Sequence, residues 1–158
     1  MRALYIDPFS GISGNMFIGA MVDGGYKIEP FLKGIHPLGF HPEDVIVEKR
    51  DKAGISATYF NLIGEEEKLS EVDDDHEHKH SHSHDHHHRD LKAVHDLIDR
   101  CDFSEEVKSL AKAIYRPLAE AEAKVHGKDP DTVHFHEVGE LDSVVDVLGA
   151  AYFTVIAD

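Results

Sequence analysis

The chain has 158 residues, of which 41% are hydrophobic, and it carries a formal net charge of −15 at pH 7. This length and apolar content predict one globular domain, with room for a flexible insert. The acidic balance argues against binding to nucleic acid or to an anionic membrane surface, and no apolar run approaches the roughly 20 residues that cross a bilayer. The single cysteine, Cys101, excludes an internal disulfide, and the absence of a visible targeting segment predicts a cytoplasmic protein.

The first third of the chain predicts a strand, two helices and a hairpin. Residues 3–6 are apolar and predict a short buried strand. After a loop, a helical stripe of apolar residues runs from 16 to 21 and stops at two glycines, and a further short helix is predicted for 29–35. Residues 45–50 and 56–63 alternate on either side of a turn and predict a β-hairpin.

The loop after the first strand contains serine and glycine residues. A strand, a glycine-containing loop and a helix are the general layout of a phosphate-binding loop. Four residues are therefore candidates for contact with a bound cofactor: Ser10, Gly11, Ser13 and Gly14. The loop lacks both common glycine-rich phosphate motifs, so turn glycines with a purely structural role are the stronger interpretation of the loop alone.

Residues 65–89 differ in composition from the rest of the chain, with acidic runs followed by eight histidines between 76 and 88. Hardly any residue in this segment is apolar, so it cannot bury enough surface to fold and is predicted to be a disordered insert. Imidazole suits nickel, copper, zinc and iron. The predicted metal ligands are His76, His78, His80, His82, His84, His86, His87 and His88. We expect a collector of several weakly bound ions, and a merely solvated loop is the alternative.

Two amphipathic helices are predicted after the insert. The first follows Asp90, a favourable N-cap, and carries an apolar stripe over 91–98. The second follows Ser104 and runs to Gly127. Pro117 falls inside the second helix and should kink or split it, because proline lacks the amide donor.

Residues 134–146 hold two imidazoles and four carboxylates within thirteen positions. Val133 and Phe135 alternate with His134 and His136. This period of two predicts a short strand with both imidazoles on one face.

From Asp142 onward the apolar spacing becomes helical, and either Asp142 or Ser143 is predicted to cap that helix. Polar side chains at a strand end that face a helix N-terminus are a common place for an anion or a metal-bound ligand. The candidate catalytic residues are Asp7, His134, His136 and Glu137. Asp142 is a further candidate for contact with a bound cofactor. A structural network of caps and hydrogen bonds is the alternative interpretation.

These elements together predict an α+β fold. The first strand, the hairpin and the strand at His134 would form a small mixed sheet covered by about five helices. The His-rich insert would interrupt this single domain.

Several segments resemble the nickel-insertion protein family of nickel-pincer cofactor biosynthesis, which matures lactate racemase. The segments are DPFSGISGNM at 7–16, GISAT at 54–58, AEAEAKVHG at 119–127, VHFHEVG at 133–139 and LDSVVDVLGA at 141–150. The family also carries a His-rich insert ahead of its paired helices. The family motif has Cys near Pro8 and Asp at Asn15, so two potential ligands are missing here.

The resemblance implies insertion of nickel into pyridinium-3,5-bisthiocarboxylic acid mononucleotide, to give a product that holds nickel through two sulfurs and a ring carbon. It implies a nickel chelatase of the lyase class that uses CTP with a divalent cation, bound by a separate C-terminal nucleotide-binding domain. We therefore expect residues 1–158 to be the N-terminal domain alone, with the C-terminal domain absent or supplied as a partner chain. A homo-oligomer is left open.

On this hypothesis the histidine loop collects nickel and passes it to Asp7, His134, His136 and Glu137, where a carboxylate or imidazole accepts the proton lost from the ring carbon. One alternative is a non-catalytic nickel or zinc storage protein or metallochaperone. A metal-dependent hydrolase is disfavoured, because barrels with a His-x-His pair need about 250 residues.

Overall fold

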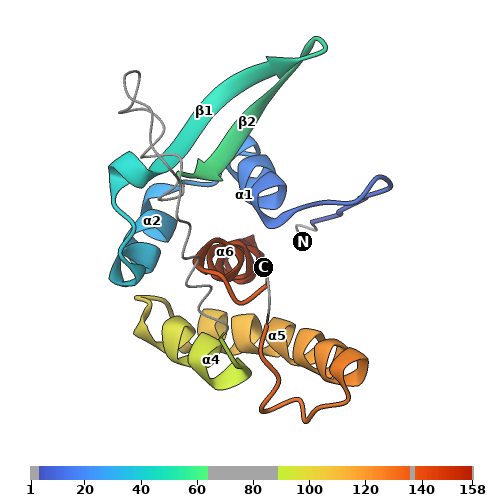
Figure 1. The fold of residues 1–158 in the computed structure, drawn as a ribbon. Coiled ribbons are helices and arrows are strands. Elements are labelled where there is room, and N and C mark those ends of the chain that lie inside the picture. The colour runs from blue at the N-terminus through green and yellow to red at the C-terminus, as the bar shows by residue number, and fades with distance from the viewer. Residues whose placement is uncertain (1–3, 64–88, 136–137, 158) are drawn as a thin grey trace, which may run out of the picture.

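The computed structural model describes residues 4–63, 89–135 and 138–157. Helix α6 (Leu141–Ala157) lies in the middle, with the hairpin, α1 and α2 on one side and α4 and α5 on the other (Figure 1). Five α-helices and a two-stranded antiparallel sheet in the described residues confirm the predicted α+β class. The predicted disordered insert, residues 65–89, lies outside the described residues apart from its last residue.

The hairpin forms as predicted from alternating residues around a tight turn. Strands β1 (Val45–Lys52) and β2 (Ile55–Leu62) pair antiparallel, with Val45 opposite Leu62. Both turn residues have positive φ, of 57° and 80°, which is the backbone that a two-residue hairpin loop needs. The hairpin packs on α1 (Gly14–Asp23), which lies against β2.

Helix caps predicted from the sequence are present in the second half of the chain. Asp90 Oδ1 accepts a hydrogen bond of 2.7 Å from the amide of Ala93 at the start of α4 (Leu91–Arg100). Ser104 Oγ caps α5 (Glu105–His126) in the same way. The remaining elements are α2 (Glu29–Ile35) and the 3-10 turns η1 (His36–Leu38) and η2 (Pro42–Asp44).

The core surrounds α6 because this helix is apolar on most of its sides. Six of its residues are buried: Val144, Val145, Leu148, Gly149, Ala151 and Phe153. Phe31 of α2 joins an aromatic cluster with Phe60, Phe103 and Phe153, at ring-centroid distances of 6.3, 5.8 and 5.7 Å. A helix that is hydrophobic nearly all round is stable only in such a central position. None of the described helices is both long and apolar enough to span a bilayer.

Two strand predictions are wrong. Residues 4–8 form no strand, and His134 makes only an isolated antiparallel bridge with Asp90. The sheet within the described residues is therefore the β1–β2 hairpin and is not mixed. Apolar residues favour extended backbone, but a strand also needs a neighbour for its amides and carbonyls, and residues 4–7 have none in the described part of the chain.

Two predictions about helix ends and breaks also need correction. Pro117 does not split α5, which is continuous from Glu105 to His126 with Tyr115 and Ala119 buried on either side of the proline; whether it kinks the helix stays a prediction. Neither Asp142 nor Ser143 caps α6. The helix begins at Leu141, two or three residues earlier than such a cap implies, so both residues lie in its first turn, where an acidic side chain is favourable.

Candidate functional site

The chain enters the site through residues 133–135. Val133 and Phe135 are buried and His134 is exposed, which confirms the alternation predicted from the sequence. The amide of Phe135 donates a hydrogen bond of 2.9 Å to the carbonyl of Arg89, next to the bridge between His134 and Asp90. This pairing fixes which way the imidazole of His134 points relative to the core.

The chain leaves the site through residues 138–139. Two side chains donate hydrogen bonds to the backbone carbonyl groups of these residues. Arg89 Nη1 donates to the carbonyl oxygen of Gly139, and Tyr115 Oη donates to that of Val138, both at 2.9 Å. A Cβ atom at position 139 would lie 2.9 Å from the Cβ of Phe135, so only glycine fits without a shift. The backbone on either side of residues 136–137 is therefore positioned by specific contacts.

Two carboxylates lie one turn apart on α6. Asp142 is exposed, whereas Asp146 is half-buried. Burial raises the pKa of Asp146 to about 6, and the negative charge of Asp142 adds to the effect. A hydrogen bond from the backbone N–H of Asn15 acts in the opposite direction but does not cancel it. Asp146 can therefore bind or release a proton close to neutral pH.

Asp146 also joins α6 to the start of α1. The N-cap residue of α1, Ser13, makes no side-chain cap, and the carboxylate of Asp146 accepts from the N–H of Asn15 instead. A Cβ atom at position 14 would lie only 2.3 Å from the Cβ of Asp146. Gly14 is thus needed for the two helices to approach, which is the structural explanation for one of the predicted loop glycines.

Tyr115 lies close enough to both carboxylates for them to act on its ionisation. Burial is the main reason that the pKa of Tyr115 is raised well above its usual value, and Asp142 and Asp146 raise it further. The hydroxyl therefore stays protonated and donates to Val138. We call the group formed by Asn15, Tyr115, Val138, Asp142 and Asp146 the acidic α6 site.

The predicted site residues divide between this site and other places. Asp142 belongs to the acidic α6 site, and Ser13 and Gly14 flank it, whereas Ser10 and Gly11 lie in the exposed loop before α1.

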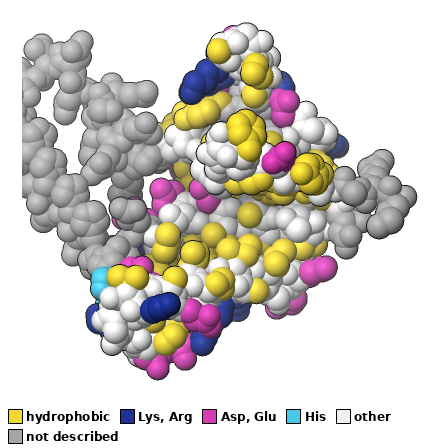
Figure 2. Space-filling view, turned by 90° about the vertical axis from the view of Figure 1, so that its right-hand side faces the viewer, with side chains coloured by type: hydrophobic (Ala, Val, Ile, Leu, Met, Phe, Trp, Pro, Cys, Tyr) yellow, Lys and Arg dark blue, Asp and Glu magenta, His cyan; other side chains and the backbone are white. Residues whose placement is uncertain are grey.

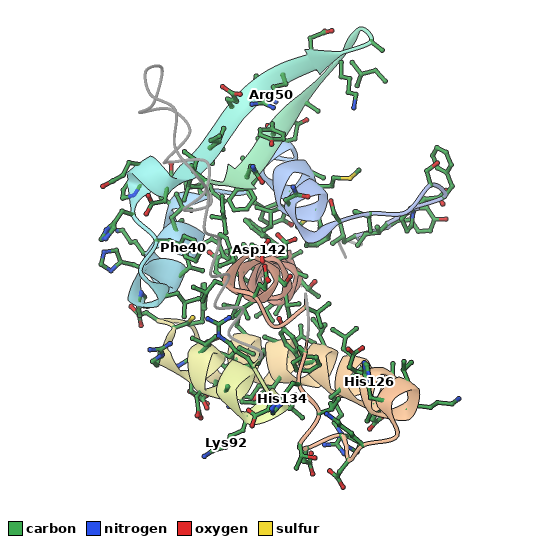
Figure 3. All side chains as sticks on the ribbon, in the orientation of Figure 1. Phe40, Arg50, Lys92, His126, His134 and Asp142 are labelled. Atoms are coloured by element: carbon green, nitrogen blue, oxygen red, sulfur yellow. The ribbon has the colours of Figure 1, made fainter. Side chains whose placement is uncertain are left out.

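Figure 3 shows His134 beside α4 and α5, apart from Asp142 on α6. Asp7 is exposed in the extended N-terminal segment. His136 and Glu137 lie outside the described residues, so the convergence of the four catalytic candidates stays a prediction.

The described residues do not bring together the ligands of a metal site. In residues 4–63, 89–135 and 138–157, no group of three or more His, Cys, Asp or Glu side chains could hold a metal ion. The eight predicted histidine ligands of the insert lie outside these ranges. Cys101 is buried, its Sγ donates to the carbonyl of Leu97, and burial raises the pKa of the thiol to about 11. Such a thiol is a poor metal ligand.

The profile of a family described as nickel insertion protein matches residues 4–156. The chain belongs to the nickel insertion protein family. Relatives named pyridinium-3,5-bisthiocarboxylic acid mononucleotide nickel insertion protein occur in Alkaliphilus metalliredigens, with 40% identity over 148 residues, and in Geobacillus kaustophilus, with 43% identity over 154 residues. A putative nickel insertion protein of Dictyoglomus thermophilum is 37% identical over 150 residues.

The matches cover most of this chain but only part of each relative. They span 94% of the chain and 35% of the Alkaliphilus protein, 96% and 35% for Geobacillus, and 95% and 34% for Dictyoglomus. The chain thus spans about a third of the length of these family members. No solved structure matches the chain.

Only some of the residues that complete the acidic α6 site could be expected from the sequence. Asp146 was not predicted, although it lies four residues after Asp142 and therefore on the same helix face, a signal that could have found it. Tyr115 and Arg89 lie far away in the chain, and only the fold brings them to Val138 and Gly139.

A separate cavity of about 650 Å³ lies between α2, η1 and η2. Leu32, Ile35 and Phe40 give it an apolar wall, and His36 and His41 line it with ring centroids 5.2 Å apart. It contains none of the predicted site residues.

Proposed function

We propose that this chain provides the metal-handling part of nickel insertion into pyridinium-3,5-bisthiocarboxylic acid mononucleotide, the precursor of the nickel-pincer cofactor of lactate racemase. The observation that carries the proposal is the family match over nearly the whole described chain, together with the substrate named for its relatives. The histidines of residues 76–88 would gather nickel as the cargo of the reaction.

Insertion at a ring carbon requires a base. The family resemblance implies a product in which nickel replaces the proton of that carbon, so the proton must be taken up by a nearby group. Asp146 is suited to this step, because its pKa of about 6 lies close to neutral pH and its carboxylate is already oriented by Asn15. We propose Asp146 as the proton acceptor and Asp142 as a charge that adds to the effect of burial on its pKa. Asp7, His134, His136 and Glu137 remain the proposed nickel and substrate ligands.

The charges around α6 also suggest how the mononucleotide is oriented. Two carboxylates attract a divalent cation and repel a phosphate group. The phosphate is therefore better placed at Ser10 and Gly11 in the exposed loop than at Ser13, which flanks the acidic α6 site. This arrangement would direct the ring and its thiocarboxylates toward the acidic α6 site.

The family resemblance also suggests the reaction class, the cellular compartment and the nucleotide that the reaction uses. We propose a chelatase of the lyase class that works in the cytoplasm and depends on CTP with a divalent cation. The nucleotide would bind to the region that the relatives carry outside the match, because the chain covers about 35% of their length. That region would be the partner domain of this chain.

The competing function is nickel or zinc storage, or delivery without chemistry. It is favoured by the lack of a three-ligand metal site in the described residues, beside a segment with eight histidines. The two functions differ in their product. A hybrid protein, in which this chain replaces the matched part of the Alkaliphilus relative, would be incubated with nickel, CTP, a divalent cation and the mononucleotide. Mass spectrometry should then show the nickel-containing mononucleotide, whereas storage gives bound nickel and unchanged mononucleotide.

The role of the acidic α6 site has its own test in the same hybrid. Asp146→Asn keeps the shape and can still accept from the N–H of Asn15, but it cannot take up a proton. We expect the insertion rate to fall roughly 10²- to 10⁴-fold with little loss of nickel binding. The unmutated hybrid should lose rate as the pH falls below about 6. Asp51→Asn in the hairpin is the matched control, and equal rates for both variants would remove Asp146 from the mechanism.

A further inference from the structure

The N-terminal segment exposes an unusual number of large apolar side chains. Within residues 4–16 the exposed fractions are 47% for Leu4, 83% for Tyr5, 45% for Ile6, 93% for Phe9, 46% for Ile12 and 60% for Met16. Scattered exposed apolar residues are ordinary in soluble proteins, but six within thirteen consecutive positions form a patch that typically marks an interface. We call residues 4–16 the apolar N-terminal segment.

The same side of the molecule carries further apolar surface. The apolar N-terminal segment and the carboxyl half of α5 project to the same side in Figure 1. Figure 2 looks onto that side and shows hydrophobic side chains both on its upper part and along a band below. Helix α5 contributes the exposed Leu118 and Val125 to the surface of the chain. The apolar surface therefore extends beyond one loop.

Among the described residues, the backbone of the start of this segment also lacks a partner. The sequence predicts a strand at 3–6, yet the described backbone of residues 4–7 makes no hydrogen bond to another described segment. Extended backbone with free amides and carbonyls is a template for an added strand. Both the side chains and the main chain thus point to the same kind of partner, an apolar strand.

The relatives indicate where that strand comes from. The family match begins at residue 4, so the family shares this segment, and yet the chain covers only 35% of the Alkaliphilus protein. About two thirds of that relative has no counterpart in this chain. A second copy of this chain is a poorer partner, because each copy carries a net charge of −15 and two copies repel each other.

We infer that the apolar N-terminal segment is the docking surface for the region that the longer relatives carry outside the match. Residues 4–6 pair with a strand of that region, and Phe9, Ile12 and Met16 are covered by it. The segment includes Gly14 and Asn15, which contact Asp146. Docking therefore places the added region beside the acidic α6 site and joins the two parts of the enzyme there. The inference rests on the proposed function only for this last consequence.

Hydrogen exchange tests the docking directly, comparing this chain alone with the hybrid in which it replaces the matched part of the Alkaliphilus relative. The amides of residues 4–7 and of Phe9 should exchange nearly unprotected in the chain alone and roughly tenfold or more slowly in the hybrid. A folded hybrid in which these amides exchange as fast as in the chain alone overturns the inference. So does protection in the chain alone that rises with protein concentration, because the partner is then a second copy.

Side-chain variants test whether the slow exchange depends on this surface or on exposed apolar residues in general. In the hybrid, Tyr5→Ser combined with Phe9→Ser should abolish the slow exchange of residues 4–7 and 9. Ile55→Ser, which changes an apolar residue that is 71% exposed at the hairpin turn, should leave it unchanged. Equal loss of protection in both variants contradicts the assigned surface. Because the exchange experiment needs no nickel, CTP or mononucleotide, its failure is distinct from a failure of nickel insertion.

Discussion

Residues 4–6 and residues 133–135 look alike in the sequence but behave differently in the fold. Both contain large apolar residues and both predict a short strand. Val133 and Phe135 are buried, and the amide of Phe135 pairs with Arg89, whereas Leu4, Tyr5 and Ile6 are exposed and unpaired within the described chain. The difference shows that an apolar pattern specifies an extended segment, while its position depends on a neighbouring chain that the pattern does not identify.

The largest expected effect comes from removing an aromatic ring in each region. Phe135 is fully buried and contacts the ring of Tyr115 at a centroid distance of 5.7 Å. Phe135→Ala should therefore lower the free energy of unfolding by about 3–5 kcal/mol. Phe9→Ala should change it by less than about 0.5 kcal/mol in the chain alone, because that ring is exposed. Chemical denaturation followed by circular dichroism measures both, and similar losses would show that residues 4–16 are packed in solution.

The next effect tests the junction between the two regions. Gly14→Ala places a Cβ atom 2.3 Å from the Cβ of Asp146, so α1 or α6 must shift. We expect a loss of roughly 1–3 kcal/mol in the free energy of unfolding. Gly24→Ala is the control, since its Cβ would meet nothing closer than 3.4 Å and its φ of −71° suits alanine. If both variants unfold alike, the close contact between α1 and α6 is wrong.

A smaller effect is expected from single hydroxyl groups. Tyr115→Phe removes the hydrogen bond to the carbonyl of Val138 and should cost about 1 kcal/mol. Tyr5→Phe should cost nothing measurable in the chain alone, because the ring of Tyr5 is exposed. Hydrogen exchange should in addition become faster around residue 138 in the first variant only. Unchanged exchange there would mean that other contacts hold the segment.

The smallest expected effect is a pH-dependent change at Asp146. Its folded pKa of about 6 lies above the usual value of 3.8, so the folded state binds the proton more tightly than the unfolded state. The stability that this proton supplies is present at low pH and is lost as the pH rises from about 4 to about 6. Asp146→Asn should thus stabilise the chain by up to about 1 kcal/mol at pH 7, after allowance for solvent screening, and by nothing near pH 3. Denaturation midpoints at both pH values test this sign, and a stability loss at pH 7 would contradict it.

Local sequence signals predicted most of the fold. The alternation around a two-residue turn gave the hairpin, and Asp90 and Ser104 gave the starts of two helices, because these features act between residues close together in the chain. The prediction of a mixed sheet was wrong because it depended on contacts between residues far apart in the chain. Strand pairing at residues 4–6 requires a distant segment, and the described chain offers none.

The candidate site was only partly accessible from the sequence. The spacing of Asp142 and Asp146 on one helix face is local, whereas the contacts of Tyr115 and Arg89 with residues 138–139 depend on how α5 and the start of α4 pack beside α6. The raised pKa of Asp146 results from its burial where the start of α1 approaches α6, and it cannot be read from the residue itself.

We propose that nickel collection and nickel insertion occur at different places in the chain. The hybrid protein tests it when nickel stoichiometry and mononucleotide product are measured together, at scarce and at excess nickel. Replacing residues 76–88 by Ser and Gly should abolish most nickel uptake and leave insertion intact in excess nickel. His136→Ala or Glu137→Gln should do the reverse, with nickel bound and little product. If the replaced loop gives no product even in excess nickel, the loop belongs to the insertion site and the claim is contradicted.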